Sequence, residues 1–479
     1  MEGVRLSRLI LLLVCIPTVL CSQERALYQT DFPPSEFKQR RDRVFEQIGK
    51  SIAIVQGASA VDGFKVFRQT NQFYYLCGVE VPNSYLLLDG RSKRTTLFLP
   101  HRDEGLERSQ GKVLSAEDAD LVMNLTGIDQ VSPIEALTRT LSSSTLRPPA
   151  PLLYTPFSPA EGEAQSRDEA LRGNTAIAED PWDGRPSREG HFIQLFHSRF
   201  PSFETRDLSP ILDELRLVKS PNEIQLIRHA SKLAGLGLME AMRSTKPGVF
   251  EYQLDAAARY VYLVNGARYV GYSSITAGGT NASMGHYFHN SSVLKNGEMV
   301  LMDFAPDYRY YTSDVTRMWP VNGKFTADQR SFAEFILAYR DALLKRIKPG
   351  VTPQKVLEGA RTEMEQVLKS TNFSKEYYRK AAEGMFTFRG HLSHPVGLTV
   401  HDVGNYWKGP YQSGQVFSVD PMLRVPEENL YIRMEDVVVV TETGVELFTD
   451  LLPSTPDEIE KTMKEAGVVQ TRPPLEIKK

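Results

Sequence analysis

The sequence predicts two domains of mixed α and β structure, an α/β domain followed by an α+β domain built from two related halves. Three observations support this prediction. The chain has 479 residues, which is more than one ordinary hydrophobic core accommodates. Short apolar strands alternate with helices in its N-terminal part, a pattern typical of α/β folds. Two sequence features recur in the same order in its C-terminal part, which indicates related halves.

Composition and charge indicate a folded globular protein. Apolar residues make up 41% of the chain and charged residues 24%, which is typical of packed domains. The formal net charge is −3 at pH 7, so no positive excess draws the chain to a polyanion. We therefore expect no nucleic-acid binding.

Residues 1–22 are predicted to be a signal peptide that does not belong to the fold. Arg5 and Arg8 precede an apolar run from Leu9 to Leu20. This run has the length of a signal-peptide core and is short for a membrane span. We therefore expect an exported protein, periplasmic or secreted, with no stable membrane span. An uncleaved, membrane-anchored form is the alternative.

An α/β domain is expected over residues 30–208. A helical stretch over residues 34–49 is followed by apolar strands over residues 51–56, 84–88 and 95–99. These short strands alternate with helical stretches, as in other α/β domains.

The last part of this domain is rich in Pro, Gly, Ser and acidic residues. From Arg147 to Arg188 this composition predicts long loops with one short strand near residues 152–155. The boundary with the second domain is expected near residues 205–215.

The second domain is expected over residues 209–462, followed by a flexible tail over residues 463–479. Ser220-Pro221-Asn222-Glu223 is a capping box with proline at the first helical position, which predicts a helix start. Thr326-Ala327-Asp328-Gln329 predicts a second helix start in the same way.

Two features repeat within this second domain. Lys246-Pro247-Gly248-Val249 recurs as Lys348-Pro349-Gly350-Val351, each time after a long helical pattern. An apolar strand that ends in an acidic residue also occurs twice, at Asp303 and at Asp420. Their common order predicts two related halves that face each other, with a ligand cleft between them.

The first acidic pair lies on a predicted hairpin. Asp303 ends the apolar strand Met299–Met302, and a turn over residues 307–310 brings the chain back to Asp314. We expect the two aspartates opposite each other, with Cβ atoms roughly 5 Å apart. Carboxylates this close repel each other unless protons or cations lie between them. A solvated hairpin is the alternative interpretation.

A second group of candidate ligands follows near the C-terminus. His394 and Asp420 precede Glu435, which is embedded in a sequence that predicts burial. A buried carboxylate needs a partner, and Arg433 is the ordinary structural candidate. Four carboxylates and one imidazole instead suit two divalent ions, manganese rather than a sulfur-loving metal. Two such ions ~3.5–4 Å apart can activate water and polarise an amide carbonyl.

Several ordered motifs around these residues resemble those of the pita-bread metallopeptidases, and within them aminopeptidase P and prolidase. The resemblance covers residues 35–455. The motifs are Phe67–Leu76, Met302–Ala305, Thr312–Arg317, Pro320–Phe325, Leu392–Leu398, Val400–Gly404 and Ile432–Asp436.

This resemblance implies a fold and an activity. The fold is an α+β pita-bread catalytic domain with pseudo-twofold halves, preceded by an α/β creatinase-type N-terminal domain. The activity is that of a Xaa-Pro aminopeptidase with two divalent metal ions, which releases the N-terminal residue from peptides with proline second. The implied metal ligands are Asp303, Asp314, His394, Asp420 and Glu435, of which Asp314 and Glu435 bridge both ions.

The resemblance also implies further site residues. His286 matches a histidine that stabilises the tetrahedral intermediate, and His401 matches one that contacts substrate near the proline. As isolated residues, both would be ordinary structural histidines. The implied catalytic residues are His286, His401, Asp420 and Glu435. The implied substrate-binding residues are His286, His391, His401 and Arg433.

Two departures from the family pattern stand out. The fourth ligand is usually glutamate but is Asp420 here. The segment that often reads His-Gly-Leu-Ser-His reads Gly-His-Leu-Ser-His from Gly390 to His394. One outer histidine is therefore displaced or absent, which we expect to affect substrate preference more than catalysis.

Three alternatives to a Xaa-Pro aminopeptidase remain at this point. A prolidase, which cleaves only dipeptides, has the same metal ligands. A non-catalytic binding module on the same fold would have lost those ligands, and a creatinase-like, metal-free hydrolase is disfavoured for the same reason. The expected partners are peptides with proline in second position and further copies of the chain in a dimer or tetramer.

Overall fold

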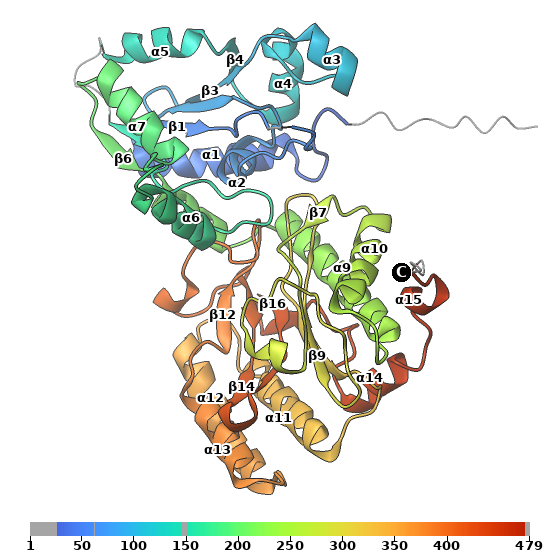
Figure 1. Cartoon of the computed structure of the whole chain (residues 1–479). Coiled ribbons are helices and arrows are strands. Elements are labelled where there is room, and N and C mark those ends of the chain that lie inside the picture. The colour runs from blue at the N-terminus through green and yellow to red at the C-terminus, as the bar shows by residue number, and fades with distance from the viewer. Residues whose placement is uncertain (1–25, 62, 146–151, 475–479) are drawn as a thin grey trace, which may run out of the picture.

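The computed structural model describes residues 26–61, 63–145 and 152–474. Figure 1 shows two domains, one above the other, joined along a broad junction. The predicted signal peptide lies outside the described residues. No helix within the described part of the chain combines the length and the apolar character needed to cross a membrane.

Within the described residues, the N-terminal domain contains one six-stranded sheet with strand order β4-β3-β2-β1-β5-β6. The strands are β1 Ile52–Gln56, β2 Tyr85–Asp89, β3 Arg94–Leu99, β4 Gln130–Pro133, β5 Leu153–Thr155 and β6 Thr205–Asp207. The helices are α1 Pro34–Ile48, α2 Asn71–Cys77, α3 Glu104–Gln110, α4 Ala119–Thr126, α5 Ala136–Thr145, α6 Arg167–Glu179 and α7 Arg188–Arg199. Strands β1 to β3 are antiparallel neighbours, whereas β4, β5 and β6 join in parallel. The α/β prediction for this domain is confirmed.

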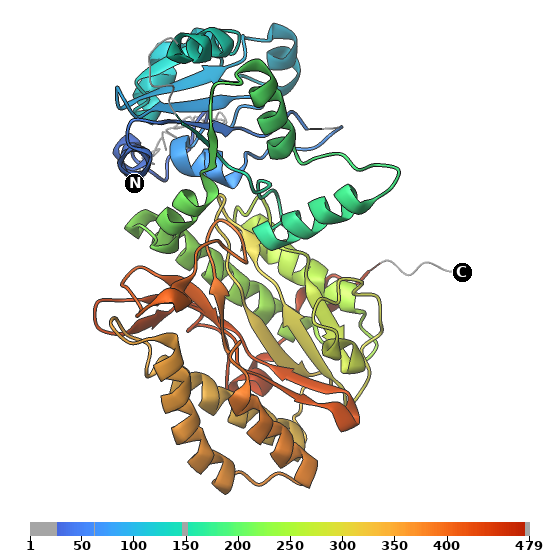
Figure 2. The same ribbon diagram turned by 90° about the vertical axis from the view of Figure 1, so that its left-hand side faces the viewer.

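Helix α6 corrects the prediction of long loops between residues 147 and 188. It begins with a capping box in which Ser166 N donates to Glu169 Oε2 over 2.7 Å. Its buried residues are Arg167 and Ala170, so it lacks the apolar stripe by which a helix is recognised in a sequence. Figures 1 and 2 show α6 on the side of the N-terminal domain that faces the C-terminal domain.

The C-terminal domain has the α+β composition that was predicted. Its helices are α8 Ser209–Leu217, α9 Pro221–Ser244, α10 Glu251–Val264, α11 Ala327–Leu344, α12 Pro353–Ser370, α13 Glu376–Gly384, α14 Pro456–Thr462 and α15 Val468–Thr471. Its strands are β7 Tyr269–Val270, β8 Ile275–Gly278, β9 Met299–Asp303, β10 Pro306–Asp307, β11 Thr316–Pro320, β12 Leu392–Pro395, β13 Val416–Val419, β14 Met422–Val425, β15 Leu430–Arg433, β16 Asp436–Val440 and β17 Val445–Leu447.

The two halves of this domain repeat the same plan. Helices α9 and α10 accompany the sheet β11-β9-β8, and helices α11 and α12 accompany the sheet β12-β13-β16-β17. Figure 2 shows the strands between these two groups of helices. The sheets meet where Glu435 N donates to Thr316 O over 3.0 Å. The predicted pseudo-twofold arrangement is therefore confirmed, and its two sheets converge on residues next to the candidate ligands.

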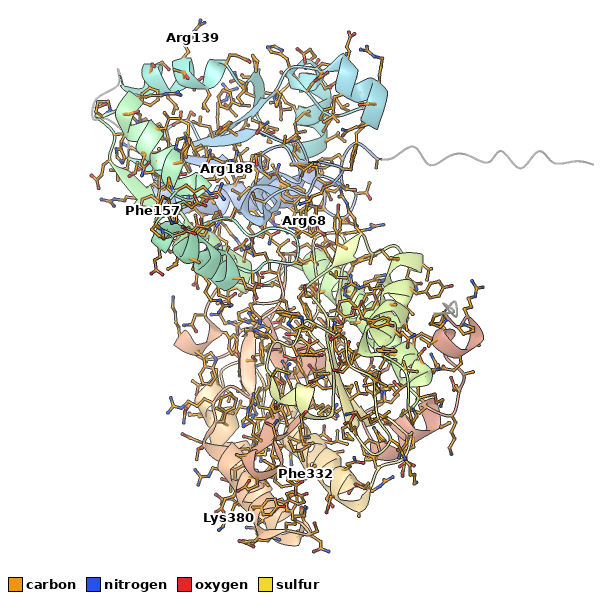
Figure 3. All side chains as sticks on the ribbon, in the orientation of Figure 1. Arg68, Arg139, Phe157, Arg188, Phe332 and Lys380 are labelled. Atoms are coloured by element: carbon orange, nitrogen blue, oxygen red, sulfur yellow. The ribbon has the colours of Figure 1, made fainter. Side chains whose placement is uncertain are left out.

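The two domains share a continuous hydrophobic core. One buried cluster contains Phe37 and Tyr74 of the N-terminal domain together with Tyr310 of the C-terminal domain. The rings of Tyr74 and Tyr310 stack with centroids 3.6 Å apart. Arg68, labelled at this junction in Figure 3, pairs with Asp307 over 3.1 Å. This packing holds the N-terminal domain over the C-terminal one.

Part of the predicted flexible tail is packed instead. Met463 is 2% exposed, and α15 lies against α9, where Gln470 Nε2 donates to Ser244 O over 2.8 Å. These contacts were not predictable because α15 is a single short turn whose stability comes from a distant helix. The described chain runs to residue 474, and the rest of the predicted tail lies outside it.

Candidate active site

The predicted metal ligands lie together where the two halves meet. Strand ends supply Asp303, the last residue of β9, and Asp420, which follows β13. Asp314 precedes β11, His394 lies on β12 and Glu435 precedes β16. The four acidic side chains are buried. Both halves therefore contribute ligands to one site, as the repeated strand pattern predicted.

The two aspartates of the first half are not directly paired. Asp303 is opposite Thr316 in the register of β9 and β11, so the predicted Asp303–Asp314 cross-strand pair is wrong. The hydroxyl of Tyr272 links them instead, 2.7 Å from Asp303 Oδ1 and 3.0 Å from Asp314 Oδ1. Sequence reasoning missed Tyr272 because no local pattern marks a tyrosine whose hydroxyl lies between two acids.

Three candidate ligands form the tightest group. Ligand atoms of Asp314, His394 and Glu435 all lie within 4.8 Å of one another. His394 Nε2 lies 3.2 Å from Asp314 Oδ2. Glu435 Oε1 is buried and has no hydrogen-bond partner among the described residues. An unpartnered buried carboxylate oxygen is costly, so this atom is available for a cation.

Arg433 lies among these carboxylates. Its Nη1 is 2.5 Å from Asp303 Oδ2, its Nε is 2.8 Å from Asp420 Oδ1 and its Nη2 is 2.6 Å from Glu435 Oε2. The guanidinium thus compensates one of these negative charges. Direct contact of Arg433 with substrate stays a prediction.

The electrostatics of the cluster fit a pair of divalent ions. When all are ionised, the four predicted carboxylate ligands around Arg433 leave three uncompensated negative charges. Burial, followed by repulsion from neighbouring acids, raises the pKa of Asp314 and Glu435 well above the usual range. Burial also lowers the pKa of His394, which favours the neutral imidazole that binds metal. The excess charge, the unpartnered oxygen and the oxygen-rich donor set all fit two hard or borderline cations.

Two further predicted histidines lie beside the cluster. The ring of His401 is 4.1 Å from that of His394, and the ring of His286 is 6.4 Å from that of His401. His286 follows the short helix Gly279–Ser283 and stacks on Phe288 with centroids 5.7 Å apart. The structure therefore brings His286 and His401 to one side of the ligand group.

His391 is the predicted site residue that the structure does not bring there. It is fully buried, and its Nε2 lies 2.8 Å from Met385 O. Burial lowers its pKa to about 4. Its own carbonyl accepts a hydrogen bond from Asp420 N over 2.8 Å. The substrate-binding prediction for His391 is thus corrected: this residue supports the strand end that carries Asp420.

Gly390 is the position at which the family pattern often has an outer histidine. A Cβ at Gly390 would lie 2.3 Å from Cζ of Phe388. The Phe388 ring thus fills the space that a side chain at position 390 requires, and Phe388 is itself exposed.

The N-terminal domain contributes two acids that sequence reasoning missed. Asp168 Oδ2 lies 3.4 Å from His401 Nδ1, and Asp168, Glu169 and His401 have ligand atoms within 4.8 Å of one another. His401 N also donates to Ser166 Oγ over 3.1 Å. The capping-box pattern from Ser166 to Glu169 could have revealed the start of α6, but its position over His401 depends on the domain arrangement.

A buried network of ion pairs holds the backbone next to His401. The next residue, Asp402, pairs with Arg216 and with Lys219, the latter over 2.8 Å. Arg216 also pairs with Glu161 of the N-terminal domain over 3.0 Å. A Cβ at Gly397 would lie 2.1 Å from Asp402 Oδ2, so only glycine permits this close approach.

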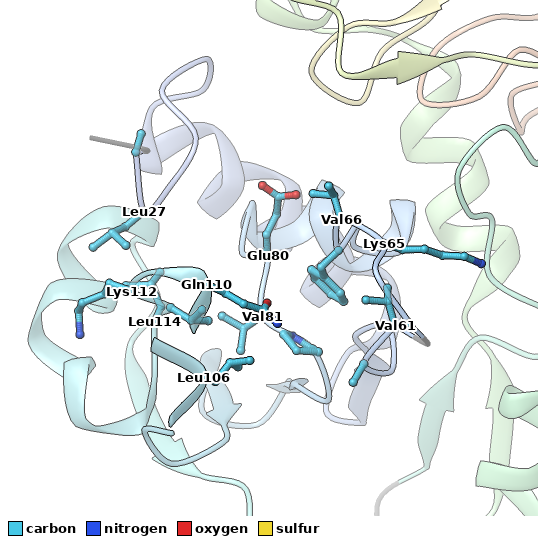
Figure 4. A pocket seen from close by; sticks show the side chains of 16 residues that line it. Leu27, Val61, Lys65, Val66, Glu80, Val81, Leu106, Gln110, Lys112 and Leu114 are labelled. Carbon is cyan, nitrogen blue, oxygen red and sulfur yellow. The ribbon is translucent and has the colours of Figure 1, made fainter. Parts of the chain in front are cut away.

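A separate cavity of about 360 Å³ lies in the N-terminal domain. Figure 4 shows its aliphatic walls, including Leu27, Val66 and Leu106. Glu80 is the one acid among the described residues that line it, no histidine is among them, and Glu80 is already paired with Arg268. The cavity therefore lacks the groups that hydrolysis requires.

Comparison with known proteins decides the family. Residues 225–442 match metallopeptidase family M24, and residues 37–150 match the aminopeptidase P N-terminal domain. The Xaa-Pro aminopeptidase of Escherichia coli K12 is 30% identical over 451 residues, which cover 89% of this chain and 97% of the relative. The chain belongs to metallopeptidase family M24.

Other M24 proteins agree with this assignment. The Xaa-Pro aminopeptidase of Haemophilus influenzae is 29% identical over 458 residues, which cover 91% of this chain and 99% of the relative. The structure of aminopeptidase P from Escherichia coli with the inhibitor Pro-Leu matches with a TM-score of 0.72 at 28% identity, over 91% of this chain and 99% of that one. The predicted family, fold class and enzyme class are confirmed, and this M24 chain is a peptide hydrolase whose family uses divalent metal ions.

Asp420 is the ligand position at which this M24 chain departs from the common pattern. Its buried carboxylate contacts Arg433, and its backbone is held by His391, so an additional methylene has little room. We expect Asp420→Glu to lower kcat by about tenfold, less than the ~10²-fold that a misplaced catalytic group can cost. We expect Asp420→Asn to weaken metal binding, because it removes a ligand charge.

Metal titration and kcat measurement on both variants and the parent check this prediction. A Glu variant that is clearly faster than the parent would show that the site has not adapted to aspartate.

Proposed function

We propose that this protein is a Xaa-Pro aminopeptidase that releases the N-terminal residue from peptides with proline in second position. The observation that carries the proposal is that all five predicted ligands lie in one cluster around His394 and Arg433, with His286 and His401 beside it. Relatives named Xaa-Pro aminopeptidase support the substrate class. The complete ligand set disfavours a non-catalytic binding module.

Each residue has a defined role in this proposal. Asp303, Asp314, His394, Asp420 and Glu435 would hold two divalent ions, with Asp314 and Glu435 shared between them. Bound ions would polarise the scissile carbonyl and lower the pKa of water. His286 donates a hydrogen bond to the oxygen of that carbonyl as charge develops on it. His401 contacts the leaving proline. Asp420 takes a proton from the attacking water and passes it to the proline nitrogen as the C–N bond breaks.

Several finer points belong to the same proposal. Manganese is the proposed metal, because the cluster offers oxygen and imidazole ligands and no thiolate. Export through a cleaved signal peptide over residues 1–22 follows from the charged and apolar pattern there. A dimer or tetramer stays a prediction, which the mass of the protein in solution would test.

Substrate preference tests the proposed function. The amide nitrogen of proline has no N–H and its ring fixes the local backbone, so a site built for Xaa-Pro needs no acceptor for that proton. We expect kcat/KM for Ala-Pro-Ala to exceed that for Ala-Ala-Ala by at least about tenfold, within the range that substrate pockets achieve. Chromatography of released alanine measures both rates. Equal rates on the two peptides would overturn the proposal.

The same assay separates an aminopeptidase from a prolidase. An aminopeptidase cleaves Ala-Pro-Ala at the first bond, whereas a prolidase cleaves only the dipeptide Ala-Pro. Cleavage confined to the dipeptide would favour the prolidase alternative.

A further inference from the structure

The N-terminal end of α6 brings two carboxylates of the N-terminal domain to the active site. Asp168 and Glu169 are the second and third residues of this helix. Their carboxylate oxygens and a ring nitrogen of His401 lie within 4.8 Å of one another. Figure 2 shows α6 running along the junction between the domains, which places its first turn over the C-terminal domain.

One side chain, that of His401, lies between these acids and the proposed metal ligands. The His401 ring separates them from the cluster, since it contacts Asp168 and also lies 4.1 Å from the ring of the ligand His394. A group bound beside His401 would therefore meet both the ligand region and the two acids.

This region is negatively charged. Burial raises the pKa of Asp168, but His401 and Arg172 more than offset it, and the net shift is downward. Arg172, an exposed side chain 3.0 Å from Asp168, supplies one compensating charge. One negative charge of the pair is left in excess.

One oxygen of the Asp168 carboxylate has no partner in the described part of the chain, and the other is held. Its Oδ2 faces His401 and Arg172, whereas its Oδ1 is buried without a hydrogen-bond partner among the described residues. Glu169 is held in place by the backbone N–H of Ser166. Both carboxylates are thus fixed beside His401 rather than free to swing into solvent.

We propose that Asp168 and Glu169 determine selectivity on the leaving-group side: they disfavour a free carboxylate on proline and favour peptides that continue past it, most of all with a cationic third residue. This inference rests on the proposed function, in which His401 contacts the leaving proline. A dipeptide carries a carboxylate at that point, whereas a longer peptide carries a neutral amide. Like charges in a partly desolvated cleft repel each other, and unlike charges attract.

Two matched substrate pairs test this proposal with the metal-loaded full chain. Ala-Pro and Ala-Pro-NH₂ differ only in the charge on the proline carboxyl group. Ala-Pro-Lys-NH₂ and Ala-Pro-Glu-NH₂ differ in the charge of the third residue. We expect kcat/KM to favour the amide over the acid, and lysine over glutamate, by roughly tenfold each at low salt. Both ratios should shrink as salt screens the charges.

Isosteric variants assign the effect to these residues. In Asp168→Asn with Glu169→Gln, both ratios should fall towards one, and glutamine at position 169 keeps the capping box. In Arg172→Gln, both ratios should rise, because the compensating cation is gone. Glu179→Gln, which neutralises an exposed acid at the other end of α6, should leave both ratios at the parent value.

Different results would overturn the proposed function and the selectivity proposal. If no Ala-Pro substrate is cleaved, the proposed function fails. If these substrates are cleaved but the ratios are the same in the parent, the double variant and Arg172→Gln, only the selectivity proposal fails. Because Arg172→Gln shifts the ratios in the opposite direction, the proposal can be overturned even if the double variant does not fold.

Discussion

Removal of divalent metal is expected to abolish peptide hydrolysis, and manganese is expected to restore it best. The physical reason is the charge of the ligand group. Asp303, Asp314, Asp420 and Glu435 are buried around a single guanidinium, and burial and mutual repulsion raise the pKa of Asp314 and Glu435. Without metal, burial and repulsion therefore disfavour the ionised carboxylates, and no cation polarises the scissile carbonyl.

Activity and metal content must be measured on the same samples. Dialysis against a chelator, elemental analysis, and re-addition of manganese, zinc or magnesium would show which ion supports turnover. Asp314→Asn should stay inactive in excess manganese, because it removes a shared ligand. Glu442→Gln, an exposed acid in the turn after β16, should behave as the parent. Full activity in a sample shown to lack transition metals would overturn the metal assignment.

Metal binding should also stabilise the folded protein. A ligand that binds only the folded state adds about 2.7 kcal/mol when its concentration is 100 times its Kd. The Glu435 oxygen without a partner and the repelling carboxylates are costs that the metal-free fold carries. The same charge repulsion that lowers the stability of the metal-free protein therefore increases its affinity for metal.

The cluster of candidate metal ligands was predictable from sequence because the signals of its members are local. Asp303 and Asp420 each end an apolar strand, and Glu435 precedes another. In each case the carboxylate is the last or first polar group of a buried strand, so the pattern itself places it at a strand end. The recurrence of the pattern predicted that both halves would contribute to one site.

The features that sequence reasoning missed depend on contacts between distant residues. The Asp303–Asp314 pairing failed because register depends on the whole hairpin, and Thr316 is the actual partner of Asp303. The family resemblance implied a substrate role for His391, but its buried position depends on the Met385 carbonyl and on surrounding rings. Such contacts leave no periodic trace in the sequence.

Helix α6 combines a local signal with a distant consequence. The capping box from Ser166 to Glu169 marks its start, but the Pro-rich and Gly-rich surroundings masked it. That its first turn lies on His401 follows from the packing of Tyr74 on Tyr310 and the pairing of Arg68 with Asp307 at the domain junction. The domain arrangement therefore completes the active site.

Asp402→Asn is expected to destabilise the protein by about 3–5 kcal/mol, the usual cost of leaving a buried charge without its partner. Asp402 pairs with Arg216 and Lys219, and all three side chains are 1% exposed. Asparagine keeps the shape of the side chain but removes its charge. Arg216 keeps one partner in Glu161, whereas Lys219 keeps only its hydrogen bond to the Arg216 carbonyl among the described residues.

Denaturant unfolding of Asp402→Asn and of a matched control would measure this effect. Asp213→Asn is the control, because Asp213 pairs with Arg167 at the edge of the same network and is 26% exposed. It should cost about 1 kcal/mol or less, as partly exposed pairs do. Equal losses in the two variants would show that the buried charge at Asp402 is not what stabilises the junction.

The same network predicts how stability depends on pH. Burial raises the pKa of Asp402, but Arg216 and Lys219 more than offset this and hold it below its usual range. A carboxyl whose pKa is depressed in the folded state contributes stability above its unfolded value of about 3.9, and this contribution is lost as the pH falls through the folded value. The stability difference between parent and Asp402→Asn should therefore be constant near neutrality and shrink below about pH 4.

Because His401 directly precedes Asp402, a variant that stays folded at pH 7 should also have a raised KM. If the variant is less stable but its KM is normal, the ion pairs of Asp402 stabilise the fold without affecting substrate binding.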